Sequence, residues 1–581
     1  MTKTNDHFKG VLLVLLLGMC SMVKGNNVLF SNGRSDYQIV ISEKASISEK
    51  TAANELQQYL AKISGVELSI TKNLNASGPK IFVGYNQKVG EMIGTRKIPA
   101  DYEGFTYRCV GKNLLIYGGS QRGTMYGVFR FLEQQLGVRW YTPQITKVPQ
   151  QRKWTFGADL KCSESPAIGY RYSNYYCTSK SPAWSAHNEE NMKWTPTENE
   201  YGNIAAYWNA HTMGQLVPAG EFFKDHPEYF ALRNGKRVAN GQLCLTNPAV
   251  LELCKQRLLQ KMRDLPGYMI YSLSQNDNEQ YCECPKCKAI EDQYGGHSGL
   301  ILWFVNQVAD AAKAEFPQKY VGTFAYVYTR KPPVGIVPRS NVVIRLCSIE
   351  SCFAHPLTAG CPQNQGFMQD LEGWSKIAPH LFIWDYVVDY AQYIAPWPNF
   401  QVLGPNIQTF RDNHAIGVFE EAQYQSAGGE FDEMKSWVLM KLLWNPQQDV
   451  NALVKDFIYG VYGKAAPKVM EYYLLCQSLV KPETHFGIYI RERDPIYSED
   501  FIKKGMVLLD DAKKAADNAE IAARVDLVNL QLLYLQSVRD PEEAISDGTW
   551  SEFVRLARLY NVRPNESMGL EQFITEMEKK K

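Results

Sequence analysis

The stretch "YMIYSLSQNDNEQYCECPKC", residues 268–287, is the part of the sequence that best indicates the fold class. It begins as an apolar, strand-like run. It then places four polar residues in succession, Asn276, Asp277, Asn278 and Glu279. A buried strand that runs out into a polar cluster is typical of a parallel α/β barrel, in which functional groups follow the carboxyl ends of the strands.

The same pattern recurs through residues 161–450, where strand-like runs alternate with longer helical or loop segments. The runs are "IGYRYSNYY", "AAYWNAH", "YFALRNGKR", "YMIYSLSQ", "YVGTFAYVYT", "VVIRLCSI", "LFIWDYVV" and "AIGVFEEA". Alternation on this scale predicts a (β/α)8 TIM-type barrel. Polar residues stand at the predicted carboxyl ends, namely His211, Asp277, Glu279, Tyr328, Asp385, Glu420 and Glu421.

The flanking segments differ from the barrel. Residues 26–160 alternate short strands with helices and contain a hairpin pattern, "EGFTYRCVGKNLLIYGGS", which predicts a small α/β domain. Residues 451–581 carry apolar residues at spacings of three and four, which predicts a C-terminal helical domain.

Residues 1–25 read as a signal peptide, because two lysines precede the short apolar run "VLLVLLLGMCSMV". Cleavage near Gly25 is favoured. The competing interpretation is a lipoprotein with a membrane tether at Cys20, although Met19 is bulkier than the residue usually found there. Either way the sequence predicts an exported protein of the periplasm or cell surface.

Composition excludes some functions. The net charge of +1 argues against a general nucleic-acid binder, which needs basic excess to neutralise phosphates. The 12% aromatic content suits sugar-binding clefts, although large cores would also account for it. The sequence has no P-loop, dinucleotide fingerprint, GxSxG or HExxH motif, and we expect no cofactor.

Asp277 and Glu279 are the first candidates for catalysis. In extended backbone, residues two apart point to the same side, so both carboxylates could face one cleft. Their proximity would raise one pKa and create a general acid. Alternatively, Asn276 and Asn278 frame a polar loop whose side chains serve the backbone. The barrel context favours a site, with the two asparagines contacting substrate.

Glu420 and Glu421 end an apolar run, and only one of them can point inward. We expect Glu420 to be the inward, catalytic residue. Asp385 stands between Trp384 and Tyr386, which is the composition of a sugar subsite wall, although aromatic residues around one Asp are also common in cores. These residues are assigned to substrate contact, as are Glu421 and two strand-end residues, His211 and Tyr328.

Three cysteines, Cys282, Cys284 and Cys287, form a CxCxxC pattern. A zinc site would need a fourth ligand, for which Cys347, Cys352 or His355 are candidates. In an exported protein disulfides are the simpler account, joining this loop to residues 347–361. Either arrangement would clamp the loop that carries Asp277.

Several stretches resemble known glycoside hydrolases. "LLIYGGSQRGTMYGVFRFLEQQLGVRWYTP" resembles the non-catalytic domain that precedes the barrel in hexosaminidases and α-glucuronidases. "SLSQNDNEQYCECPKC", "LFIWDYVVDYAQYIAPWPNF" and "GVFEEAQYQSAGGEFDEMKSWVLMKLLWNP" resemble glycoside hydrolase family 163, exported gut-bacterial proteins formerly listed as a domain of unknown function. The resemblance implies an endo-β-N-acetylglucosaminidase that cleaves the GlcNAc-β1,4-GlcNAc core bond of complex N-glycans or glycoproteins.

Related endo-acting enzymes use the substrate's 2-acetamido group as nucleophile and place an acidic or amide residue two before the acid. By this resemblance Glu279 would be the acid, and Asp277 or a neighbouring Asn would orient the acetamide. Glu420 and Asp385 would contact the −1 sugar. An inverting scheme like that of α-glucuronidases would make Glu420 or Asp385 the base.

Two other functions stay open. A uronic-acid-releasing glycosidase would need basic side chains for the sugar carboxylate, and Arg171 and Arg345 are the candidates near strand ends. A non-catalytic glycan-binding protein would keep the aromatic residues while its carboxylates left the cleft.

Overall fold

The computed structural model describes residues 27–94 and 97–579. The predicted signal peptide, with Cys20, lies outside the described residues. The described chain falls into two compact units. The first comprises residues 27–45, 49–94, 97–132 and 149–164, and the second comprises residues 46–48, 133–148 and 165–579. Among the described residues, no helix is long and apolar enough to cross a membrane.

The first unit is built on a six-stranded mixed sheet in the order β10-β5-β6-β4-β2-β3. Its strands are β2 (Gln38–Val40), β3 (Ile70–Thr71), β4 (Lys80–Val83), β5 (Phe105–Val110), β6 (Asn113–Gly118) and β10 (Lys161–Glu164). β1 (Asn27–Ser31) pairs with β9 (Lys153–Phe156). The helices of this part of the chain are α1 (Ile47–Ser64), α2 (Gln87–Ile93) and α3 (Gly123–Leu136). The predicted hairpin is formed by β5 and β6, and Gly111 takes the positive φ of 61° that its turn requires.

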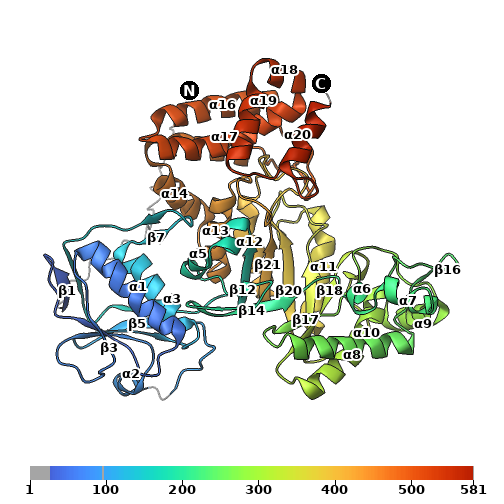
Figure 1. The fold of residues 1–581 in the computed structure, drawn as a ribbon, viewed down its shortest axis with the longest axis horizontal. Coiled ribbons are helices and arrows are strands. Elements are labelled where there is room, and N and C mark those ends of the chain that lie inside the picture. The colour runs from blue at the N-terminus through green and yellow to red at the C-terminus, as the bar shows by residue number, and fades with distance from the viewer. Residues whose placement is uncertain (1–26, 95–96, 580–581) are drawn as a thin grey trace, which may run out of the picture. The chain divides into compact units, whose positions relative to one another are not determined.

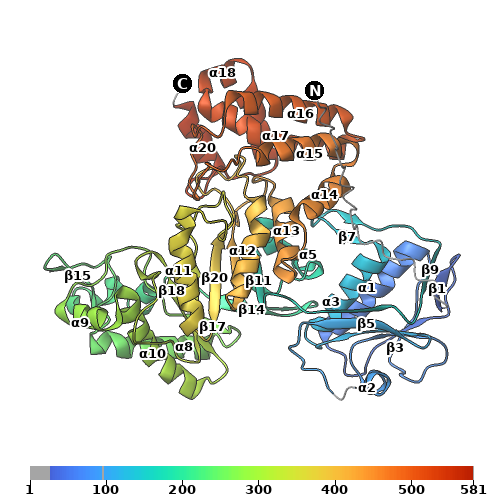
Figure 2. The same cartoon turned by 180° about the vertical axis from the view of Figure 1, so that it is seen from behind.

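The second unit contains a barrel of eight parallel strands (Figures 1 and 2). In chain order they are β11 (Tyr170–Asn174), β12 (Met192–Lys193), β14 (Gly202–Trp208), β17 (Ile270–Ser272), β18 (Tyr320–Ala325), β19 (Val342–Cys347), β20 (Leu381–Tyr386) and β21 (Ala415–Glu421). Seven parallel pairings join these strands in the order β11-β21-β20-β19-β18-β17-β14-β12, so that β11 and β12 stand at the two ends of the order. The ring closes next to β12, where the Asn191 N–H donates to the Arg171 carbonyl at 3.3 Å. The predicted (β/α)8 class is confirmed.

One barrel strand differs from the prediction. The run at residues 229–237 forms the small hairpin of β15 (Leu232–Arg233) and β16 (Lys236–Arg237), inside the connection between β14 and β17. The second barrel strand is instead Met192–Lys193, and two residues are too few to show alternation in the sequence.

The barrel connections vary in length. They contain α4 (Tyr176–Lys180), α5 (Pro182–His187), β13 (Thr197–Asn199), α6 (Met213–Leu216), α7 (Ala219–Phe222), η1 (Pro227–Tyr229), α8 (Pro248–Asp264), α9 (Pro285–Tyr294), α10 (His297–Glu315), η2 (Val327–Thr329), α11 (Pro362–Ile377), α12 (Phe400–Asp412) and α13 (Asp432–Trp444). α9 begins within the CxCxxC stretch, and its end residues show why a helix forms there. Pro285 occupies its first turn, and Gly295 ends it with a φ of 81°.

Aromatic side chains pack around the guanidinium of Arg345 in the barrel interior. Arg345 on β19 is 1% exposed. Its guanidinium carbon lies 4.3 Å from the ring centroid of Tyr207, 4.4 Å from that of Trp384 and 4.8 Å from that of Phe419. These contacts offset part of the cost of burying the charge. The interior is therefore a packed core, and any cleft must lie at the carboxyl ends of the strands.

The chain before and after the barrel adds further elements to the second unit. β7 (Arg139–Trp140) pairs with β8 (Thr146–Lys147). The C-terminal helices are α14 (Val450–Val461), η3 (Gly463–Ala465), α15 (Ala466–Gln477), α16 (Glu499–Ala515), α17 (Ala519–Arg539), α18 (Pro541–Ser546), α19 (Thr549–Leu559) and α20 (Leu570–Glu578). Loops between these helices reach the loop after β20. The Tyr390 N–H donates to the Ile488 carbonyl at 2.9 Å, and the Glu566 N–H donates to the Tyr390 carbonyl at 3.1 Å.

Candidate active site

A cleft of about 260 Å³ opens at the carboxyl ends of the barrel strands. Three carboxylates and several aromatic rings face it. The lining residues are His211, Asp277, Phe324, Tyr326, Cys347, Ile349, Trp384, Tyr386, Tyr390, Glu421, Ile488, Tyr489 and Glu566. Aromatic walls with a few polar groups suit sugar rings, whose apolar faces stack on aromatic side chains.

Asp277 provides the solvated carboxylate of the cleft. Its side chain is 67% exposed. The Tyr326 hydroxyl donates to Asp277 Oδ1 at 3.2 Å, and His211 Nε2 lies 3.9 Å from the same oxygen. His211 Nδ1 lies 2.8 Å from the Gln275 carbonyl oxygen, so this nitrogen carries a proton and Nε2 is left to face Asp277. His211 has a left-handed φ of 52°, and a hydrogen bond from its N–H to Ser274 Oγ at 3.0 Å helps to hold it there.

Glu421, the last residue of β21, provides a second carboxylate in a different environment. Trp384 Nε1 donates to Glu421 Oε2 at 2.7 Å. Burial raises the pKa of Glu421 to about 7, the charge of Glu566 adds to the rise, and the Trp384 hydrogen bond opposes it. A carboxyl group with this pKa can both donate and accept a proton near neutral pH.

Glu566 is the third carboxylate, and sequence reasoning missed it. It lies between α19 and α20, far along the chain from the barrel. Burial and the charge of Asp277 raise its pKa, and Arg563 lowers it. Neither strand pattern nor motif marks this position, because only the packing of a C-terminal loop against Tyr390 brings it to the cleft.

Glu420 and Asp385 do not line the cleft, which corrects the expectation that Glu420 is the inward residue. The register pairs Asp385 with Glu420 and Tyr386 with Glu421 on neighbouring strands. Alternate residues face opposite sides of a strand. Glu421 and Tyr386 therefore face the cleft, while Glu420 and Asp385 are buried outside the barrel interior.

The buried carboxyl groups of Asp385 and Glu420 have few hydrogen bonds. The Ser348 hydroxyl donates to Asp385 Oδ1, whereas neither carboxylate oxygen of Glu420 has a hydrogen-bond partner among the described residues. Burial raises the pKa of Asp385 to about 6. Burial and then the charge of Asp385 raise the pKa of Glu420. Trp384 and Tyr386, the neighbours of Asp385, line the cleft.

Glu279 is exposed and is not among the cleft-lining residues, so the structure does not bring it to Asp277 as expected. The reason is local. β17 ends at Ser272, and the Asn278 N–H donates to the Asn276 carbonyl at 2.8 Å, which turns the chain and removes the extended alternation.

The two asparagines brace this loop. Asn276 Oδ1 accepts from the Gly214 N–H at 2.8 Å, and its Nδ2 donates to the Gly241 carbonyl at 2.9 Å. Asn278 Nδ2 donates to the Asn240 carbonyl at 3.2 Å. The alternative interpretation of this polar stretch, side chains that serve the backbone, therefore describes the asparagines.

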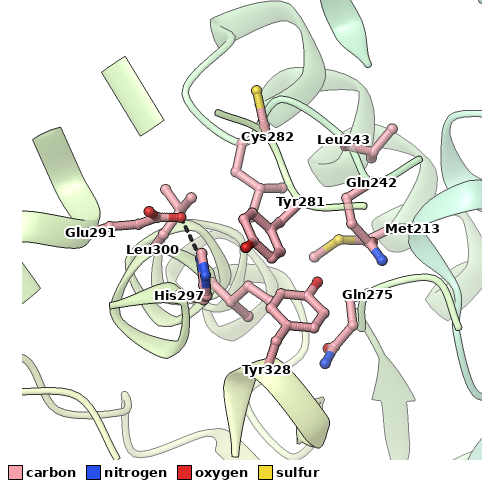
Figure 3. A pocket seen from close by; sticks show the side chains of 12 residues that line it. Met213, Gln242, Leu243, Gln275, Tyr281, Cys282, Glu291, His297, Leu300 and Tyr328 are labelled. Atoms are coloured by element: carbon pink, nitrogen blue, oxygen red, sulfur yellow. Dashed lines mark hydrogen bonds and ion pairs between the residues drawn. The ribbon is translucent and has the colours of Figure 1, made fainter. Parts of the chain in front are cut away.

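Tyr328 lies in a separate cavity of about 20 Å³, next to Tyr281 and His297 (Figure 3). The Tyr281 ring centroid lies 4.0 Å from that of His297 and 5.5 Å from that of Tyr328. His297 Nδ1 bonds to Glu291 at 2.6 Å. The close packing and the water-sized volume make this an aromatic brace for the loop after β17, outside the cleft.

The cysteine predictions need two corrections. All the cysteines in the described part of the chain are free, so the predicted disulfides are not formed. The CxCxxC cysteines approach Cys244, whereas Cys347, a predicted fourth ligand, lines the cleft. Cys352 and His355 form a separate cluster with other partners.

Comparison with known proteins supports this architecture. Residues 140–474 match the family model described as Domain of unknown function (DUF4838). Residues 31–131 match the model described as Glycosyl hydrolase family 67 N-terminus, and this match supports a glycoside hydrolase. No curated protein has a significantly similar sequence.

Among solved structures, a family GH115 4-O-methyl-α-glucuronidase with specificity for decorated arabinogalactans superposes with a TM-score of 0.55. The two chains are 14% identical, and the match covers 92% of this chain and 77% of the other. A chitobiase of Flavobacterium johnsoniae gives a TM-score of 0.45 at 11% identity, covering 96% of this chain and 97% of the other. At this identity, the likeness to the glucuronidase shows the fold alone.

Proposed function

The chain belongs to the family described as a domain of unknown function (DUF4838), and we propose that it is a glycoside hydrolase whose reaction takes place at Asp277 and Glu421. One observation carries the proposal. Two carboxylates in unlike environments face one aromatic-walled cleft at the carboxyl ends of the barrel strands. Such a pair is how glycosidases divide the acid role from the stabilising role.

The finer proposal is an endo-β-N-acetylglucosaminidase acting on the GlcNAc-β1,4-GlcNAc core bond of complex N-glycans. It is supported by the sequence resemblance and by the aromatic walls. Arg or Lys does not occur among the described residues that line the cleft. That lining favours a neutral sugar over a uronic acid, because a sugar carboxylate would need a cationic partner. The export predicted from residues 1–25 fits a glycan substrate.

Each carboxyl group then has a role. Glu421 donates its proton to the glycosidic oxygen as the bond from that oxygen to C1 breaks. Asp277 accepts a hydrogen bond from the N–H of the substrate's 2-acetamido group. This bond orients the acetamido carbonyl oxygen, which attacks C1. Water then opens the cyclic intermediate, and the Glu421 carboxylate takes the proton of that water. Glu421 thus replaces Glu279 as the proposed acid, while Asp277 keeps the role expected of it.

The substrate assignment is tested by mass spectrometry of a complex-type N-glycoprotein incubated with the wild-type enzyme. We expect loss of the glycan with one GlcNAc left on the asparagine. Glu421→Gln should abolish this loss, and Glu279→Gln, a matched control outside the cleft, should not. An intact glycoprotein after incubation with the wild type would reject complex N-glycans. Full activity of Glu421→Gln would reject the acid.

The acid role of Glu421 and the orienting role of Asp277 can be distinguished by comparing variants on substrates with different leaving groups. Glu421→Gln should lose about 10²–10⁴-fold in kcat/KM on a natural glycan but should keep near-wild-type kcat/KM on an aryl glycoside, whose leaving group needs no proton. Its kcat on the aryl glycoside should fall, because Glu421 also takes the proton of the water that opens the intermediate. Asp277→Asn should lose activity on both substrates, because the acetamide is no longer oriented. If instead Asp277→Asn kept its activity on the aryl glycoside and Glu421→Gln lost activity on both substrates, Asp277 would be the acid and Glu421 would orient the acetamide.

A further inference from the structure

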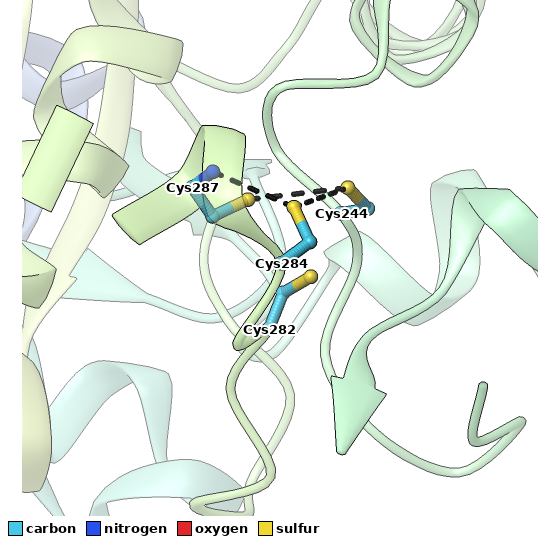
Figure 4. Close-up of side chains that lie close together, drawn as sticks. All are labelled: Cys244, Cys282, Cys284 and Cys287. Carbon is cyan, nitrogen blue, oxygen red and sulfur yellow. Dashed lines mark hydrogen bonds between the residues drawn. The ribbon is translucent and has the colours of Figure 1, made fainter. Parts of the chain in front are cut away.

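Four cysteines gather beside the loop that carries Asp277, outside the residues that line the cleft (Figure 4). Cys282, Cys284 and Cys287 follow β17, whereas Cys244 lies in the preceding connection. All four are buried, and their sulfur atoms lie within 4.8 Å of one another. Cys244 Sγ lies 3.7 Å from Cys284 Sγ and 3.9 Å from Cys287 Sγ.

These separations fit a tetrahedral metal site. Four thiolates about 2.3 Å from one zinc ion stand about 3.8 Å apart along each edge of the tetrahedron. A disulfide would bring two sulfur atoms to about 2.05 Å. Clustered cysteines at the tetrahedral spacing have the geometry of ligands.

The surroundings of the sulfur atoms suit thiolates. The Leu232 N–H donates to Cys282 Sγ at 3.3 Å, and the Cys287 N–H donates to Cys284 Sγ at 3.4 Å. The Arg237 guanidinium lies 4.0 Å from Cys282 Sγ. Cys284 is also the N-cap of α9, so the positive end of that helix faces the cluster. Donors, a cation and a helix N-terminus all favour the deprotonated sulfur that binds a metal.

A second cluster stands on other elements and combines two cysteines with two histidines. Cys352, His355 and Cys361 lie between β19 and α11, and His485 comes from the segment between α15 and α16. Cys352 Sγ lies 3.6 Å from His355 Nδ1 and 3.5 Å from His485 Nδ1. Cys361 Sγ lies 3.5 Å from His485 Nδ1. Sulfur at about 2.3 Å and nitrogen at about 2.05 Å from one zinc ion would stand about 3.6 Å apart.

We propose that the chain binds two structural zinc ions, one at Cys244, Cys282, Cys284 and Cys287 and one at Cys352, His355, Cys361 and His485. Each cluster supplies four protein ligands, which fill a tetrahedral shell and leave no open position for substrate or water. The mixed sulfur and nitrogen set of the second cluster suits zinc.

The positions of the two sites explain what the metals do. The first ties the segment at Cys244 to the loop that follows Asp277. The second ties the segment after β19 to the loop that carries Ile488 and Tyr489, both of which line the cleft. Loops that carry functional residues need such supports, because a long connection has little core of its own.

Metal analysis of the purified full-length chain, grown with zinc in the medium, tests the proposal. Elemental analysis by mass spectrometry should give two zinc ions per chain. Cys282→Ser and His485→Gln should each lower the content to one. Cys254→Ala, a matched control at a buried cysteine of α8 outside both clusters, should keep two.

X-ray absorption at the zinc edge should show Zn–S distances of about 2.3 Å together with a Zn–N shell at about 2.0–2.1 Å. These wild-type measurements decide the matter even if a variant fails to fold. A wild-type chain without zinc, iron at the four-cysteine site, or cysteines that resist alkylation under denaturing, non-reducing conditions would overturn the proposal.

Discussion

At the scale of single residues, the protonation of Glu421 depends on its burial and on two neighbours, Glu566 and Trp384. The pKa of Glu421 is raised to about 7, because burial and the charge of Glu566 raise it by more than the Trp384 N–H lowers it by stabilising the carboxylate. If Glu421 is the acid, it must hold its proton when substrate binds. The activity should therefore fall as the pH rises through about 7.

Two substitutions should move this alkaline limb in opposite directions. Trp384→Phe removes the hydrogen bond that favours the ionised form, so the pKa of Glu421 rises and the limb moves to higher pH. Glu566→Gln removes a nearby negative charge, so the pKa falls and the limb moves to lower pH. The measurement is the pH profile of kcat/KM on a glycopeptide that carries a complex N-glycan, because departure of its leaving group needs the proton of Glu421. Shifts of the same sign in both variants would contradict the assignment.

At the scale of elements, the pairing of β20 with β21 buries two carboxyl groups, Asp385 and Glu420, outside the barrel interior. Their pKa values are raised, Asp385 to about 6, so the native state binds protons more tightly than the unfolded chain does. The resulting stability is fully present below the unfolded pKa values, near 4, and is lost as the pH rises toward the folded values.

Glu420→Gln should remove the part of this pH dependence that belongs to Glu420. Between pH 5 and the folded pKa of Glu420, the titration of Glu420 should lower the wild-type free energy of unfolding by up to about 1.4 kcal/mol per pH unit. The Glu420→Gln variant should lack this slope. Denaturant unfolding at several pH values measures it. Glu279→Gln serves as the control, because that side chain is exposed. Parallel curves for wild type and Glu420→Gln would contradict the role of the pair.

At the scale of the whole molecule, the C-terminal helical region completes the cleft. It supplies Ile488, Tyr489 and Glu566, and it hydrogen-bonds the Tyr390 loop on both sides. A barrel without this region would leave the Tyr390 N–H and carbonyl groups without these partners, and buried backbone groups without partners are costly.

A chain ended after residue 447 should therefore have no measurable activity and a lowered or broadened thermal unfolding transition. The full-length double variant Tyr489→Ala and Glu566→Ala is the matched control. It should unfold as cooperatively as wild type while KM rises, because only cleft contacts are lost. Wild-type kcat/KM from the shortened chain would show that the barrel alone forms the site.

The sequence by itself determined the fold class and the position of Asp277, because alternating apolar runs and polar strand ends are local patterns. It placed Trp384, Tyr386 and His211 near strand ends for the same reason. It could not say which of Glu420 and Glu421 faces inward, since that depends on the register of β21 against β20 and β11. Two adjacent glutamates look alike along a single strand.

Only the tertiary structure decided the remaining features. Glu279 leaves the cleft because a turn follows β17, and Glu566 enters it because a distant loop packs on Tyr390. Cys244 and His485 lie far along the chain from the other cysteines and histidine of their clusters, so the spacing of residues within a short motif could not identify them as members. Patterns along a chain report local geometry, whereas a cleft or a metal site is assembled from segments that only packing brings together.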